Sequence, residues 1–284
     1  MRWQIGRRSS NVEDRRGMSA PRAGGIGCLG LAVIIAIAYF TGTNPLELLQ
    51  QVGTDTSVST QAPSVTPGVN DTDRAFVESV LGSTEDVWAE VFAGEGRRYQ
   101  PPHLVLFENA VRSACGFNSA AVGPFYCPPD QYVYLDLSFF NELGRRFGAP
   151  GDFAQAYVIA HEVGHHVQNL LGISDEVDRL RRRANEREAN ALSVLLELQA
   201  DCFAGVWGNH AAKVKDYLEA GDVEEGLKAA QAIGDDLIQK RSQGYVNPDS
   251  FTHGTSEQRV SWLRRGLQTG RLDSCNTFDS AARY

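Results

Sequence analysis

The sequence predicts an α+β fold dominated by helices, with a small sheet ahead of a central helix and one transmembrane helix near the N-terminus. Three observations predict it: an apolar run over residues 24–40 within a stretch that has no charge from 23 to 46, strand-like runs before residue 138, and helical spacing of apolar residues from residue 152 onward. Of the 284 residues, 42% are hydrophobic and 22% charged, as in globular domains. The net charge of −8 argues against a nucleic-acid partner, which selects basic surfaces.

The N-terminal part predicts a membrane anchor. Residues 1–22 contain six arginines, and residues 23–42 form an uncharged apolar segment long enough for one crossing. A basic flank before a crossing segment indicates a cytoplasmic N-terminus, with the rest of the chain outside the cytoplasm. The alternative is a cleaved signal peptide, because Ala36-Ile37-Ala38 fits a cleavage site. The apolar run continues past it, which favours an uncleaved anchor that contacts the lipid bilayer. Cys28 precedes the apolar core and is interpreted as a membrane cysteine.

Residues 43–70 predict a flexible linker, because they are rich in Ser, Thr, Gly, Pro and Gln. A folded domain is expected over residues 71–284. Its first part predicts the following elements: a helix or two helices in series over 73–92, interrupted at Gly82-Ser83; a strand over Leu104–Phe107; a loop over 115–127; a strand over Tyr132–Leu137; and a helix over 137–147.

The second part predicts only helices. Asp152 is a natural N-cap for a long central helix that Gly172 closes. Further helices are expected over 174–187, 189–207, 211–234 (with breaks near Gly221 and Gly226), 235–242 and 256–268. The last begins with a capping-box pattern, Thr255-Ser256-Glu257-Gln258.

The central helix carries His161-Glu162-Val163-Gly164-His165, an H-E-x-x-H pattern. Residues four apart share one helix face, so His161 and His165 can bind a single ion. Glu162 lies about 100° further round the helix, where a general base for a metal-activated water belongs. The pattern predicts one Zn²⁺ per chain.

A zinc peptidase needs a third protein ligand. A histidine six residues after the motif is excluded, because Leu171 stands there. Glu197 and Asp201, four apart in an apolar helix, supply the alternative. Glu197 can bind the metal while Asp201 accepts the outer N–H of a ligating histidine. The alternative is that Glu197 and Asp201 have no role in metal binding and lie on the solvent-facing side of an amphipathic helix.

An H-E-x-x-H followed by a helical E-x-x-x-D resembles the gluzincin arrangement. More closely, the chain resembles the bacterial "putative neutral zinc metallopeptidase" family, whose members are membrane-anchored. The resemblance spans nearly the whole chain, apart from residues 43–70, and implies a zincin-like domain and a peptidase. The matching segments are Met1–Trp3, Asn11–Arg16, Gly123–Cys127, His161–Gln168, Glu197–Cys202 and His253–Arg259.

The catalytic roles follow from this resemblance and from the motif. Glu162 is expected to act as general base. Gluzincins use a downstream His or Tyr to stabilise the oxyanion, and His253, in a polar loop before a capped helix, is our candidate. Weaker alternatives are Tyr132, Tyr134 and Tyr245. Because position i+1 points away from the ion, His166 is expected to pack, and His103 and His210 are expected to be structural. The strand Tyr132–Leu137 could bind an extended substrate as an edge strand.

Four cysteines lie beyond the anchor, and four allow three pairings. We favour Cys115–Cys127, which closes a short loop, and Cys202–Cys275, which ties the C-terminal segment to the Glu197 helix. Disulfides would fit an oxidising compartment. The alternative is buried free thiols.

The sequence thus predicts a single-pass membrane protein with a cytoplasmic N-terminus and an outward-facing zinc endopeptidase that acts on peptides or unfolded proteins. The alternative from a different class is a non-catalytic, metal-stabilised envelope protein that binds or scaffolds partners on the same fold.

Overall fold

A computed structural model describes residues 1–17, 71–214 and 217–281. Met1–Arg16 and Asn70–Tyr284 belong to one compact unit. The predicted membrane anchor at 23–42 and linker at 43–70 lie outside the described residues. Within the described residues, no helix is both long and apolar enough to span a bilayer.

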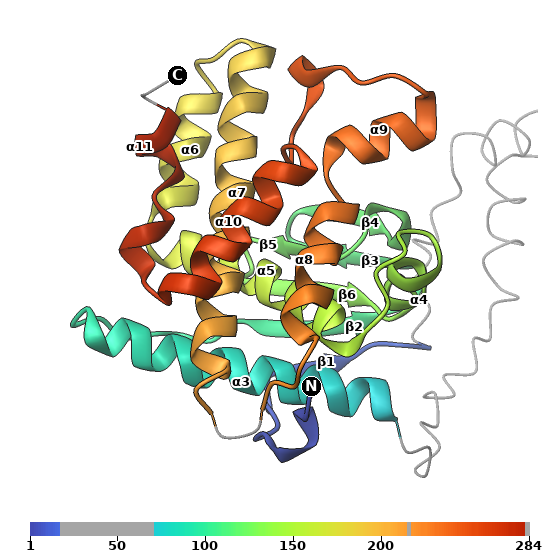
Figure 1. The fold of residues 1–284 in the computed structure, drawn as a ribbon, viewed down its shortest axis with the longest axis vertical. Helices are drawn as coiled ribbons and strands as arrows, with labels where there is room; N and C mark the ends of the chain where they lie inside the picture. Colours follow the sequence, from blue (N-terminus) through green and yellow to red (C-terminus); the bar gives the residue numbers. More distant parts are fainter. Residues whose placement is uncertain (18–70, 215–216, 282–284) are drawn as a thin grey trace, which may run out of the picture. The chain divides into compact units, whose positions relative to one another are not determined.

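The elements of this unit confirm a helix-dominated α+β fold with a small sheet (Figure 1). In chain order they are η1 (Trp3–Ile5), β1 (Val12–Asp14), α3 (Thr72–Gly94), β2 (His103–Phe107), β3 (Ala110–Ser113), β4 (Gly116–Ser119), η2 (Ala120–Val122), β5 (Phe125–Cys127), β6 (Tyr132–Asp136), α4 (Ser138–Arg145), α5 (Asp152–Leu170), α6 (Ile173–Arg181), α7 (Glu186–Ala211), α8 (Asp222–Ala232), α9 (Asp235–Gln243), η3 (Pro248–Ser250), α10 (Ser256–Thr269), η4 (Leu272–Cys275) and α11 (Thr277–Ala281).

The main sheet has the strand order β1-β2-β6-β5. β1, β2 and β6 run parallel, and β5 pairs antiparallel with β6. The expectation that Tyr132–Leu137 forms an edge strand is therefore wrong, because β2 and β5 flank β6 on both sides. The edge strands are β1 and β5, and β5 lies within the segment 115–127 that the sequence predicted to be a loop. The same segment contributes β4 to a hairpin with β3.

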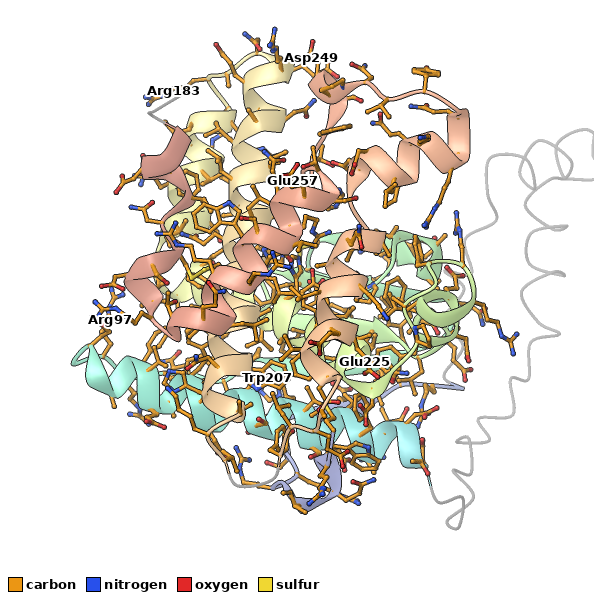
Figure 2. The ribbon with its side chains drawn as sticks, in the orientation of Figure 1. Arg97, Arg183, Trp207, Glu225, Asp249 and Glu257 are labelled. Atoms are coloured by element: carbon orange, nitrogen blue, oxygen red, sulfur yellow. A yellow bond between two sulfur atoms is a disulfide. The ribbon has the colours of Figure 1, made fainter. Side chains whose placement is uncertain are left out.

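The core lies between the sheet and the helices, and α3, α5 and α7 meet there. Trp207 on α7 is fully buried where α7 passes α3 (Figure 2). Its ring stacks on Phe153 of α5 at a centroid distance of 5.7 Å, and its Nε1–H donates to Ser83 Oγ of α3 at 3.1 Å. One side chain thus joins the three helices and satisfies its own polar atom, as a buried indole requires.

Residues Met1–Arg16 are an integral part of this unit. β1 pairs with β2 in register Val12–Leu104, and the α-amino group of Met1 donates to Asp152 Oδ1 at 2.7 Å and Asp222 Oδ1 at 3.1 Å. Gly82 of α3 lets this segment approach closely, because a Cβ there would lie 2.5 Å from the Arg7 carbonyl oxygen.

The predicted division of the chain set residues 1–22 apart from the folded domain, whereas the contacts join Met1–Arg16 to it. Basic side chains of this segment pair with acidic partners far along the sequence. Arg7 contacts Glu85, and Arg16 contacts Asp71.

Several predicted helix boundaries also change. The expected break at Gly82-Ser83 is absent, since α3 is continuous from Thr72 to Gly94. Asp152 is the first residue of α5, and its N-cap is Gly151. The helix expected over 211–234 is confined to α8, because α7 ends at Ala211 and the left-handed Gly221 precedes α8.

Glu85 is the main anchor of the N-terminal segment on α3, and its loss should destabilise the fold. Its carboxylate is 7% exposed and accepts hydrogen bonds from Ser9 Oγ (2.5 Å), Asn11 Nδ2 (2.8 Å) and Arg7 Nη2 (2.6 Å). Glu85→Ala should lower the free energy of unfolding by about 2–4 kcal/mol, because the buried Ser9 hydroxyl and two further donors lose their acceptor.

Asp86 is the matched control, since Arg7 also contacts it but its side chain is 62% exposed. Asp86→Ala should lower the unfolding free energy by less than about 1 kcal/mol. Chemical denaturation of the full chain measures both changes, and equal losses in the two variants would contradict this account.

Candidate metal centre

Two helices bring the predicted ligands together. α5 carries His161 and His165 one turn apart, and α7 carries Glu197. α7 begins with a capping box between Asn185 and Glu188, which fixes its start. The helices come very close beside the motif, because a Cβ on Gly164 would lie 3.0 Å from the carbonyl oxygen of Ala200. A larger residue between the two histidines would move the third ligand away.

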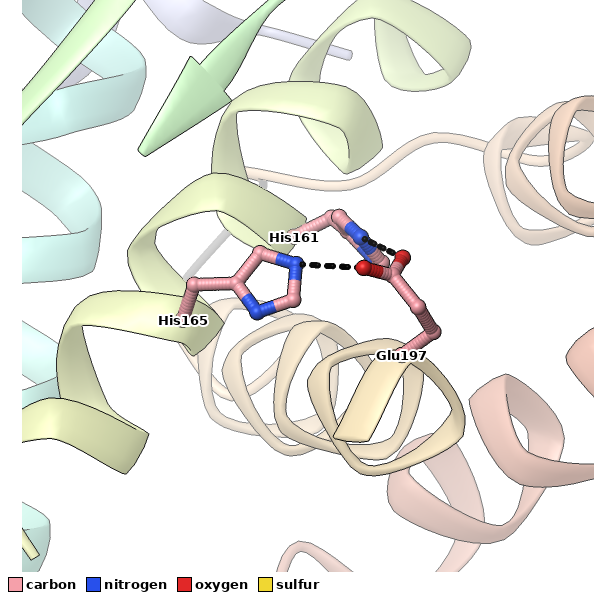
Figure 3. A group of neighbouring side chains, drawn as sticks. All are labelled: His161, His165 and Glu197. Atoms are coloured by element: carbon pink, nitrogen blue, oxygen red, sulfur yellow. Dashed lines mark hydrogen bonds and ion pairs between the residues drawn. The ribbon is translucent and has the colours of Figure 1, made fainter. Parts of the chain in front are cut away.

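Figure 3 shows the three side chains converging on one point. His161 Nε2 lies 3.2 Å from Glu197 Oε2, and His165 Nε2 lies 3.3 Å from Glu197 Oε1. One donor atom from each residue falls within 4.8 Å of the others. Two imidazole nitrogens and one carboxylate oxygen are the donor set that catalytic zinc prefers, with a fourth position open.

The outer nitrogen of each histidine is also held. His161 Nδ1–H donates to Asp201 Oδ1 at 2.8 Å, and His165 Nδ1–H donates to Gln168 Oε1 at 2.8 Å. The Gln168 amide is fixed in turn, because its Nε2–H donates to the Leu196 carbonyl oxygen at 2.6 Å. These contacts place the proton on Nδ1 of both rings and leave both Nε2 atoms facing the metal position.

The electrostatics of the site favour a cation. Burial acts to lower the pKa of His161, but the carboxylates of Asp201 and Glu197 outweigh it and raise the pKa to about 10. The pKa of His165 is raised as well, since Glu197 outweighs the effect of burial. A buried cluster that holds protons this strongly has excess negative charge, and a divalent cation can neutralise it.

The metal position opens into a cleft of about 600 Å³. Glu162, 8% exposed, lines this cleft beside His161 and His165. His253 lines it from the loop before α10. Its Nδ1–H donates to Asp235 Oδ1 at 3.2 Å, and its backbone N–H donates to Asp235 Oδ2 at 2.7 Å. The cleft thus brings the predicted base and the predicted oxyanion donor to the same space as the ligands.

The remaining histidines lie elsewhere, as expected. His166 is fully buried, with Nε2–H donating to the Gln100 carbonyl oxygen at 2.7 Å and Nδ1 accepting from Tyr126 Oη at 3.0 Å. Burial lowers its pKa to about 4, so it is a neutral packing residue. His210 Nε2–H donates to the Gly270 carbonyl oxygen at 2.9 Å. The ring of His103 contacts Tyr132.

The tyrosines considered as alternatives to His253 do not line the cleft. Tyr132 lies beside His103, Tyr134 Oη donates to Asp130 Oδ2 at 2.8 Å, and Tyr245 is 65% exposed.

Both predicted disulfides are present. Cys115–Cys127 joins the end of β5 to the β3–β4 turn, and Cys202–Cys275 ties η4 to α7 one residue after Asp201. The first stabilises the edge of the sheet beside the cleft, and the second stabilises the helix that supplies Glu197.

Four further residues support the site and were not predicted from the sequence. Gln168 and Tyr157 were detectable in principle, because they lie three residues after His165 and four residues before His161 on α5. Arg259 contacts Asp201, and Asp235 contacts His253. Arg259 ends the matching segment His253–Arg259, but the segment does not indicate its role, since only the tertiary fold brings Arg259 and Asp235 to their partners.

Comparisons with known proteins agree with this geometry. A family model described as "Putative neutral zinc metallopeptidase" matches residues 1–278. "Uncharacterized protein YpfJ" of Escherichia coli strain K12 is 48% identical, over 98% of this chain and 99% of its own. "Uncharacterized protein Mb2605" of Mycobacterium bovis is 44% identical, over 70% of this chain and 68% of its own. No solved structure matches. With its two histidines, one glutamate and whole-length match, the chain belongs to the family of neutral zinc metallopeptidases that this model describes.

Proposed function

We propose that this chain is a zinc-dependent endopeptidase of the gluzincin type that cleaves extended or unfolded polypeptides. The observation that carries the proposal is the convergence of His161 Nε2, His165 Nε2 and the Glu197 carboxylate, with Asp201 and Gln168 holding the outer nitrogens. The family membership supports the same activity. A scaffold that only used metal for stability would not need Glu162 in an open cleft.

When bound, Zn²⁺ activates water and polarises the substrate carbonyl. Glu162 takes the proton from the attacking water and passes it to the leaving amine. His253, in its protonated form, donates from Nε2 to the oxyanion, because its Nδ1–H is committed to Asp235. Asp201 and Gln168 keep both ligand rings in the orientation that the reaction needs.

The substrate binds along β5. This strand is an edge of the sheet, and Phe125 and Tyr126 line the cleft. Its free backbone groups can pair with an extended peptide without selecting a sequence. The hydroxyl of Tyr126 donates to His166 on α5 and accepts from Asn169 at 3.0 Å, which fixes the edge strand relative to the metal ligands.

The folded unit lies outside the cytoplasm at a membrane, and residues 1–16 lie with it. Two disulfides support an oxidising compartment. The apolar segment at 23–42 is the contact with the bilayer, as the sequence predicts. Residues 1–16 share the compartment of the domain, because β1 pairs with β2.

Glu162→Gln tests the catalytic proposal. It should lower the rate of cleavage of an unstructured protein by about 10²–10⁴-fold, because the general base is lost. Its zinc content should match that of the wild type, whereas Glu197→Gln should lower zinc content as well. Glu257→Gln, at an exposed position of α10, is the control and should leave cleavage rate and zinc content unchanged.

Full activity in Glu162→Gln would sink the mechanism. Zinc bound by the wild type without cleavage of any unstructured substrate would favour the scaffold function instead.

Asp235→Asn tests the role of His253. The hydrogen bond to Asp235 raises the pKa of His253 against the opposing effect of burial. Glu197 raises this pKa further and Arg259 lowers it. Protonated His253 is present below its pKa and is lost as the pH rises through it, so the alkaline limb of kcat/KM should report it. Asp235→Asn should move this limb to lower pH, and the exposed Asp249→Asn should not. An unmoved limb in Asp235→Asn would remove His253 from the mechanism.

Thiol labelling tests the membrane arrangement. Single cysteines replace two exposed arginines, Arg8 in the N-terminal segment and Arg187 on α7, in a chain with Cys28→Ser. A reagent that does not cross membranes should label both equally in intact cells. Labelling at residue 187 alone, with residue 8 reached only after the cells are opened, would show that the two segments lie on opposite sides.

A further inference from the structure

Arg259 is a buried arginine on α10, only 3% exposed. Its guanidinium forms a two-pronged contact with the Asp201 carboxylate. Nε–H donates to Oδ2 at 2.8 Å, and Nη2–H donates to Oδ1 at 2.9 Å. The remaining donors reach the Tyr157 hydroxyl at 3.2 Å and the Ile233 carbonyl oxygen at 3.3 Å. The side chain is therefore held by hydrogen bonds inside the protein and is not available to solvent.

Asp201 is the centre of this network. Its Oδ1 accepts from Tyr157 Oη at 2.5 Å and from His161 Nδ1 at 2.8 Å, in addition to Arg259. The carboxylate is fully buried. With both oxygens engaged, it cannot rotate without breaking several hydrogen bonds. The plane of the His161 ring is fixed by the same set of contacts.

We propose that Arg259, together with Tyr157, is a positioning residue for the metal ligand His161, an inference that rests on the proposed zinc site. Arg259 holds the Asp201 carboxylate in one orientation through its two parallel hydrogen bonds. Asp201 then directs His161 Nε2 at the metal. Three helices contribute to this chain of contacts, since Tyr157 and His161 lie on α5, Asp201 on α7 and Arg259 on α10.

The geometry explains why the residue is an arginine. A planar guanidinium presents two parallel N–H donors that match the two oxygens of a carboxylate, whereas a lysine offers a compact point charge. A lysine at this position could balance the charge of Asp201 but would leave its orientation undetermined. Charge and geometry can therefore be separated by experiment.

The same arginine links the metal ligands to the His253 loop. α10 begins at Ser256, after a loop that contains His253, and Arg259 lies in its first turn. The backbone N–H groups of His253 and Gly254 are held by Asp235 at 2.7 and 3.1 Å. The position of α10 thus sets the distance between the oxyanion donor and the metal, and Arg259 fixes α10 to Asp201.

Zinc affinity tests the inference without relying on turnover. Arg259→Lys in the full chain should weaken zinc binding about 10–100-fold in competition with a chromophoric chelator, as loss of an outer contact to a metal ligand does. Tyr157→Phe should weaken it less, because the guanidinium contacts remain. Arg264→Lys, exposed on the same helix, should bind as the wild type does. The visible spectrum of bound Co²⁺ should change in Arg259→Lys and stay unchanged in Arg264→Lys. Wild-type affinity in Arg259→Lys would overturn the proposal.

A double variant separates positioning from simple charge balance. Arg259→Met alone leaves a buried carboxylate unpaired and should destabilise the fold. Adding Asp201→Asn removes that charge and should restore much of the stability, but zinc affinity should remain weak. Recovery of both properties together would show that Arg259 only balances charge.

The outcomes also distinguish this inference from the proposed function. If the wild type fails to bind zinc, both are wrong. If the wild type binds zinc and cleaves protein while Arg259→Lys binds zinc equally well, only the positioning role is wrong. A wild type that binds zinc without cleavage, combined with weak binding by Arg259→Lys, supports the positioning role and contradicts the peptidase.

Discussion

The close approach of α5 and α7 is the constraint on which the site depends. Glu197 has a short side chain and must reach the space between two imidazoles on another helix. It does so because Gly164, between the two histidines, allows the backbone of Ala200 to lie against α5. The same approach brings Asp201 to the outer nitrogen of His161, one turn further along α7. A single contact between backbones therefore determines the position of the ligand Glu197 and of Asp201, which orients His161.

The buried charges around this contact are arranged in two groups. Asp201 is paired with Arg259, and the pair is neutral. Glu197 faces the two imidazoles, with its carboxylate oxygens 3.2 and 3.3 Å from their Nε2 atoms. The pairing lets Asp201 orient His161 while Glu197 keeps its charge for a metal. Burying these five ionisable groups is unfavourable unless each is compensated, and here the compensation and the function use the same contacts.

The sequence predicted the parts of the site that depend on helix periodicity. His161, Glu162 and His165 share one helix, and Glu197 and Asp201 share another. Their spacing in the sequence is therefore enough to predict which side chains of each helix lie on the same face. The strands β2 and β6 were also detectable, because they are rich in strand-forming residues. β1, β3, β4 and β5 were not, because each is only three or four residues long, too short to show an alternating pattern. Their pairing depends on partners elsewhere in the chain.

Long-range charge pairing explains the other differences. The arginines near the N-terminus resemble a membrane-flanking segment. Only the fold shows that two of them form ion pairs with Glu85 and Asp71. Asp235 belongs to no matching segment, and Arg259 ends one without any sign of its contact with Asp201. Their importance arises from the residues that α10 and α9 bring to them, which no local pattern contains.

The position of β1 has a consequence for how the chain folds. β1 emerges first during synthesis, yet its partner β2 lies about ninety residues later. The strand cannot be paired until the apolar segment and all of α3 have been made. Contacts of such long sequence separation form slowly, because the loop must close before they stabilise anything. The main sheet therefore acquires its outer strand late, and until then β2 presents an open edge that a chaperone or another chain can occupy.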